Sequence, residues 1–158
     1  MKKSHDTSKA YSRFALMLAC SFIAMYITMY LNTYAWDHIY FSLTRFYMVC
    51  LGISAMAIIM WGFMRPMYKN KMKNRIIIWG SIGLFLVALI LVRSQIPVGE
   101  VAYMKAMIPH HSIAVLTSKR AKIKDPEVQQ LAKEIIEAQE EEIAEMKRYI
   151  KRIENKEH

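Results

Sequence analysis

Acidic residues are almost absent from the first part of this sequence. Residues 1–97 contain only Asp6 and Asp37 against eleven Lys and Arg side chains, whereas residues 98–158 contain eleven side chains of each sign. The net charge of +9 therefore belongs entirely to the first part, which is also the more apolar one. A nucleic-acid-binding protein would carry such an excess on a soluble face, so the distribution argues against that class and indicates charges that flank membrane segments.

Cysteine and glycine are too scarce to support several common kinds of functional site. Cys20 and Cys50 both fall inside apolar runs and the sequence has no CxxC pair, so we expect no structural disulfide. The sequence also has no nucleophile elbow, no glycine-rich phosphate loop and no clear Ser–His–acid set. Any catalysis would therefore have to be metal redox chemistry. The candidate ligands give no evidence for such chemistry, so we do not expect an enzyme.

Three long runs without any charged residue dominate the first part, namely Phe14–Leu31, Phe46–Met64 and Ile76–Val92. Each has about the 17–25 residues that a helix needs to cross a bilayer. Residues 1–95 are therefore predicted to form a transmembrane region with three spans. The residues before Cys20 loosely resemble a lipoprotein cleavage box, but the apolar sequence continues well past it, which favours an uncleaved helix.

Lysine and arginine predict how these spans are oriented. Residues 1–13 carry four of them and residues 65–75 carry five, whereas residues 32–45 carry only Arg45. The positive-inside rule places the N-terminus and the 65–75 loop in the cytoplasm, so everything after Val92 lies on the extracellular or periplasmic side of the cell membrane. The 30–41 segment supplies aromatic residues for the outer interface, namely Tyr30, Tyr34, Trp36, Tyr40 and Phe41.

A second, helical part follows the short break at residues 96–99. Helical periodicity predicts one helix over about 101–121 and another to about residue 152. Asp125 is a suitable N-cap for the second helix, and Pro126 suits its first position. Because the connection is short, the two helices should form an antiparallel hairpin.

The expected fold class is therefore all-α, with three transmembrane helices in residues 1–95 followed by an extramembrane helical hairpin in residues 98–158. A hairpin of this size buries little core. We expect it to gain a partner, either a second copy that completes a four-helix bundle or the outer ends of the membrane helices.

Methionine and histidine share one face of the first hairpin helix. At 100° per residue, Met104, Met107 and His111 fall on a narrow stripe, with His110 at its edge. On the second helix, the residues that share a stripe on the apolar side are Gln139, Glu142 and Met146. If the two stripes meet, thioether, imidazole and oxygen ligands converge. The alternative is a methionine-rich core with surface histidines, which the spacing does not exclude.

Ligand chemistry favours copper(I) for such a site, because thioether and imidazole groups are soft ligands. Zinc would instead use His110, His111 and Glu142. A di-iron bundle requires Glu-x-x-His pairs. None precedes His110 or His111, so di-iron chemistry is not expected.

These motifs resemble the domain of unknown function family 305 (DUF305) over residues 98–153. The resemblance lies in the Met-Ile-Pro-His-His stretch at 107–111 and in downstream residues Gln139, Glu142, Ile143 and Met146. It implies a ferritin-like helical bundle, of which this hairpin would be half. Some family members are periplasmic copper-binding proteins, so the resemblance implies metal candidates at Met104, Met107, His110, His111 and Met146.

Two functions follow from the sequence. The first is a membrane-anchored protein that binds copper at the outer face of the membrane, for buffering, delivery or sensing. The second is a structural module without catalysis that forms a homo-oligomer through the hairpin, whose mixed charges would then form a pairing surface. Membrane lipid is the other expected partner, and nucleic acid is not expected.

Overall fold

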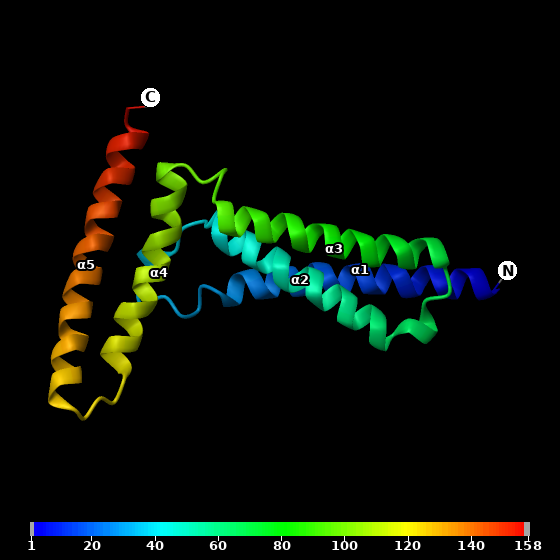
Figure 1. The fold of residues 1–158 in the computed structure, drawn as a ribbon, viewed down its shortest axis with the longest axis horizontal. Helices are drawn as coiled ribbons and strands as arrows, with labels where there is room; N and C mark the ends of the chain where they lie inside the picture. Colours follow the sequence, from blue (N-terminus) through cyan, green and yellow to red (C-terminus); the bar gives the residue numbers. More distant parts are fainter. Residues whose placement is uncertain (1, 157–158) are drawn as a thin grey trace. The chain divides into compact units, whose positions relative to one another are not determined.

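The chain folds entirely into helices, as the sequence predicted. The computed structural model describes residues 2–156, with side chains from Lys9 onward. Over this range the chain forms five α-helices and two short 3-10 helices (Figure 1), which are α1 (Lys2–Thr28), η1 (Trp36–His38), α2 (Leu43–Phe63), η2 (Arg65–Met67), α3 (Lys71–Ser94), α4 (Glu100–Arg120) and α5 (Pro126–Glu154).

Three of the helices are long and apolar enough to cross a membrane. The candidate spans are Lys9–Thr28, Leu43–Phe63 and Lys71–Ser94, which agrees with the three runs predicted from the sequence. Only 11% of the most apolar window is buried in the first and third spans. Most of their apolar surface therefore needs an apolar medium outside the protein, which a bilayer would provide.

The chain divides into two compact units. One comprises the chain up to Ile27 together with Thr44–Ile96, and the other comprises Thr28–Leu43 together with the chain from Pro97 onward. The sequence suggested a simple division at about residue 96. The structure instead groups the α1–α2 connection with the hairpin helices, because this connection forms hydrogen bonds with α4.

In the first unit, buried aromatic side chains hold the three apolar helices together at one end. Tyr11 and Phe14 of α1 pack with Ala57 of α2 and with Tyr68 of the α2–α3 connection. The Tyr11 hydroxyl group also donates a hydrogen bond of 2.7 Å to the Asn74 side chain of α3. This end of the unit is therefore fixed by both packing and hydrogen bonding.

In the second unit, α4 and α5 lie side by side and run antiparallel (Figure 1), as the short connection predicted. The Asp125 side chain caps α5 by accepting hydrogen bonds from the backbone N–H groups of Glu127 and Val128. The apolar core between the helices consists of Met104, Ile108, Val115, Ile143 and Ile150. Tyr40 of the α1–α2 connection packs against this core.

Candidate metal site

A cavity of about 730 Å³ lies between α4 and α5, toward the start of α4 and the end of α5. Its lining residues are Val98, Gly99, Glu100, Tyr103, Met104, Met107, His111, Glu142, Glu145, Met146, Tyr149, Arg152 and Ile153. Five of the six metal candidates named from the sequence are among them, three of sulfur, one of imidazole and one of carboxylate. Members of both predicted stripes therefore line one cavity, whereas Gln139 and His110 lie outside its lining.

The two adjacent histidines have different surroundings. His111 lines the cavity, whereas His110 is exposed and is not part of the lining. Their ring centroids are 6.1 Å apart and the ring planes meet at 64°. Consecutive helix residues point about 100° apart, so only one of the two can face α5 directly.

The Glu142 carboxylate lies within hydrogen-bonding distance of His111. The His111 Nδ1 atom lies 2.8 Å from Glu142 Oε2. The Nδ1 atom is buried, and the distance to this carboxylate is that of a charge-assisted hydrogen bond. Gln139, the remaining polar residue of the predicted stripe, donates a hydrogen bond of 3.4 Å to Glu142 Oε2. A carboxylate beside one ring nitrogen fixes the orientation of an imidazole and leaves the other ring nitrogen for a ligand.

Burial lowers the pKa of His111 below its usual value of 6.5. The nearby His110 also lowers this pKa, while the negative charge of Glu142 opposes the shift. The imidazole is therefore neutral near pH 7, with a nitrogen lone pair available to a metal ion. Glu142 is exposed and lies at the solvent side of the pair.

The cavity lining contains both soft and hard ligand groups. Across residues 9–156, whose side chains the structure describes, no group of three or more His, Cys, Asp and Glu side chains is arranged to hold a metal ion. The zinc set considered from the sequence is not assembled at the cavity, because His110 lies outside it. Met104 is buried and Met107 and Met146 are partly buried, so the cavity offers three thioethers and one imidazole beside the three carboxylates of Glu100, Glu142 and Glu145.

Aromatic and charged side chains form the part of the cavity nearest the end of α5. The Tyr149 hydroxyl group donates a hydrogen bond of 2.5 Å to Glu145. The Arg152 guanidinium group lies 4.8 Å from the centre of the Tyr149 ring. This part is polar, whereas the three methionines contribute apolar, sulfur-containing surface.

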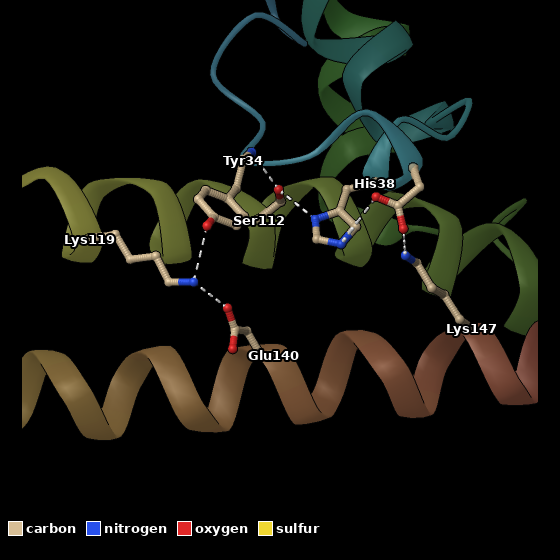
Figure 2. Close-up of polar contacts among 7 residues, drawn as sticks. Tyr34, His38, Ser112, Lys119, Glu140 and Lys147 are labelled. Atoms are coloured by element: carbon tan, nitrogen blue, oxygen red, sulfur yellow. Dashed lines mark hydrogen bonds and ion pairs between the residues drawn. The ribbon is translucent and has the colours of Figure 1, made fainter.

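Sequence reasoning missed a set of contacts next to His111. Ser112 is fully buried and accepts a hydrogen bond of 2.7 Å from the Tyr34 backbone N–H group (Figure 2). The Ser112 hydroxyl group also lies 2.9 Å from His38 Nδ1. These contacts explain why the α1–α2 connection groups with the hairpin. A serine inside a helix gives no sequence signal for a partner 78 positions away.

Ion pairs extend the same attachment to α5. Lys147 of α5 forms an ion pair of 2.5 Å with Asp37 (Figure 2). Lys119 of α4 forms one of 2.6 Å with Glu140 of α5, and it donates a hydrogen bond of 3.2 Å to the Tyr34 hydroxyl group. The α1–α2 connection therefore bridges both helices of the hairpin.

His38 is part of this bridge and has an altered pKa. Burial lowers the pKa of His38, and the positive charge of Lys147 lowers it further, while Asp37 and Glu140 act in the opposite direction. The hydrogen bond from Lys147 lowers the pKa of Asp37. Near pH 7 the bridge thus combines a neutral imidazole with a charged carboxylate–ammonium pair.

Comparison with known proteins identifies a family for this chain. Residues 95–158 match the family described as "Domain of unknown function (DUF305)". The chain belongs to this family. An uncharacterized protein of Acanthamoeba polyphaga mimivirus is 35% identical to it over 138 residues, which cover 85% of this chain and 89% of the viral protein. That similarity therefore extends beyond the family domain into the apolar helices. No solved structure matches the chain significantly.

Proposed function

We propose that this protein binds copper(I) in the cavity between α4 and α5, while its apolar helices anchor it in a membrane. The observation that carries the proposal is that Met104, Met107 and Met146 line the same cavity as His111, a partly buried histidine whose Nδ1 atom lies 2.8 Å from Glu142. Soft thioether and neutral imidazole ligands favour copper(I) over harder ions. A membrane-anchored member of DUF305 could buffer, deliver or sense the metal.

Each cavity residue has a distinct part in this proposal. The three methionines supply sulfur, and His111 supplies one nitrogen. Glu142 orients His111 through the contact at 2.8 Å and adds negative charge that attracts a cation. Bound copper would supply a soft cation for storage or transfer, and no covalent turnover is needed. His110 is exposed, so its proposed contribution is to metal entry from solvent.

The charge distribution supports an orientation for the proposed protein. The basic residues of segments 1–13 and 65–75 would lie in the cytoplasm, and the hairpin would lie outside, where copper arrives in an uptake or resistance system. The proposed cavity then samples metal on the extracellular or periplasmic side. Membrane anchoring keeps the site close to the surface at which the metal enters.

The adjacent histidines allow a matched test. Full-length protein in detergent would be titrated with copper(I) against a competing chelator. His111→Ala should weaken binding about 100-fold or more, exceeding the roughly 10- to 100-fold loss typical of an outer-shell partner. His110→Ala should change the affinity by less than about fivefold, because its ring lies outside the cavity. Equal effects of the two changes, or wild-type affinity in both, would refute the site.

A second candidate function is self-association through α5, without a metal. Two apolar side chains on this helix, Val128 and Leu131, are 46% and 53% exposed. Exposed apolar side chains on a helix face favour burial against a partner. Sedimentation of the detergent-solubilised protein distinguishes the candidates, since this function predicts the same oligomer with copper and with a chelator.

A further inference from the structure

Exposed basic side chains gather at one end of the first unit. They come from α1, from the α2–α3 connection and from the first turns of α3, and they include Arg13, Arg65, Lys69, Lys71, Lys73 and Arg75. This end is independent of the proposed copper cavity, whose lining belongs to the second unit.

Hydrogen bonds hold these segments together. The Tyr11 hydroxyl group of α1 donates to Asn74 at 2.7 Å and accepts a hydrogen bond of 3.1 Å from the Asn70 backbone N–H group. The Asn74 side chain in turn donates to the Tyr68 carbonyl group at 2.8 Å. The basic residues of α1 and of the connection are thus carried on a fixed framework rather than on independent segments.

No acidic partner of this cluster is present among the side chains from Lys9 to Lys156. None of the ion pairs in the described part of the chain involves these six side chains. Asp6 is the only acidic residue in the sequence of this unit. Two of the cations rest on aromatic rings, with Arg65 5.8 Å from the centre of Trp61 and Lys73 5.0 Å from that of Tyr11. Such contacts orient the cations but leave their charges uncompensated.

The cluster also lies where lipid headgroups would be. The apolar helix α2 ends at Phe63 and the candidate span of α3 begins at Lys71. The basic segment between them therefore falls at the level of the membrane interface. Clustered Lys and Arg residues next to a span attract anionic lipids over a distance of about one Debye length.

We propose that this end of the first unit is a binding site for anionic phospholipid headgroups. The phosphodiester group of a lipid with net negative charge would lie among the side chains of the α2–α3 connection. Zwitterionic lipids carry the same phosphate but also a compensating ammonium group, so they would bind more weakly.

Fluorescence of Trp61 can report on this binding, because the residue lies in the last turn of α2 beside Arg65. The full chain, with Trp36→Phe and Trp79→Phe changes, would be placed in vesicles of phosphatidylcholine and phosphatidylglycerol. One lipid at a time would carry bromine on its acyl chains as a quencher. Brominated phosphatidylglycerol should quench Trp61 at about a threefold lower mole fraction than brominated phosphatidylcholine, and the difference should shrink in high salt.

A matched pair of triple variants separates local binding from total charge. The first triple variant combines Lys69→Gln, Lys71→Gln and Lys73→Gln. It should reduce the difference in quenching between the two lipids from about threefold to about onefold. The same number of changes at Lys122, Lys124 and Lys133, exposed in the second unit, should leave it intact. Equal quenching by both lipids in the unaltered chain would overturn the proposal, and so would a preference that survives the first triple change. An unchanged emission maximum would confirm that Trp61 keeps its surroundings in each variant.

Discussion

Three consecutive residues of α4 have three different surroundings. His110 faces solvent, His111 faces α5 at the cavity, and Ser112 is buried against the α1–α2 connection. Helical geometry forces this division because successive side chains point in different directions. Any change at the cavity histidine is therefore one residue away from the contact that holds the connection in place.

Acid should weaken the second unit. Burial lowers the pKa of His111 and of His38, so each imidazole is harder to protonate in the folded state than in the unfolded state. A histidine with a lowered folded pKa contributes stability that is present above its unfolded value of 6.5 and is lost as the pH falls through the folded value. Thermal unfolding between pH 7.5 and pH 5 should therefore show a falling melting temperature.

Two variants test the source of this pH dependence. His111→Asn and His38→Asn should each flatten the profile below about pH 6.5, because they remove a group that gains a proton on unfolding. Copper(I) affinity should fall over the same pH range in the unaltered protein, since a proton competes for the imidazole lone pair. If the melting temperature still falls steeply with pH when His38→Asn and His111→Asn are combined, other groups cause the pH dependence.

At the scale of elements, the α1–α2 connection packs against the two-helix hairpin and covers part of it. It contributes Tyr40 to the apolar core and hydrogen bonds to α4. It also forms an ion pair with α5 through Asp37 and Lys147. A two-helix hairpin buries little apolar surface, so these additional contacts contribute to its stability.

Ser112→Ala tests the importance of this connection. The change leaves the Tyr34 N–H group without its acceptor, which costs about 1–3 kcal/mol when the group stays buried. Hydrogen exchange of the Tyr34 amide should therefore accelerate by about 5- to 150-fold. Ser118→Ala on the same helix is the matched control and should leave this amide unchanged. Slow exchange in Ser112→Ala would mean that another group holds the connection.

The elements themselves could largely be predicted from the sequence. Charge-free runs identified three apolar helices, and Asp125 with Pro126 identified the start of α5, because each signal is local. The convergence of Met104, Met107 and Met146 followed from helical periodicity once a hairpin was assumed. The attachment of the α1–α2 connection did not follow, since its aromatic residues suggested only an interfacial belt. Tyr34 and Ser112 carry no mark of their pairing.

At the scale of the whole molecule, the two units differ in apolar surface, in charge and in the presence of the cavity. The first unit has three helices with lipid-compatible surfaces and an unbalanced positive charge. The second unit carries nearly all the acidic residues and the candidate metal cavity. The α1–α2 connection belongs by its contacts to the second unit although both of its ends lead into apolar helices.

The proposed orientation predicts which side of the membrane each unit reaches. Cysteine introduced by Lys122→Cys, in the connection between α4 and α5, should react with an impermeant maleimide in intact cells. Cysteine introduced by Lys69→Cys should react only after permeabilisation, because the positive-inside rule places that segment in the cytoplasm. Both positions are exposed. The reverse pattern would invert the orientation, and the cavity would then face cytoplasmic copper.

X-ray absorption at the copper edge tests the central claim most directly. The full-length protein loaded with one equivalent of copper(I) should show sulfur scatterers together with an imidazole contribution. His111→Ala should lose the imidazole contribution, while His110→Ala should retain it. A metal surrounded only by nitrogen and oxygen, or a spectrum unchanged by His111→Ala, would contradict a copper site built from the methionines and His111.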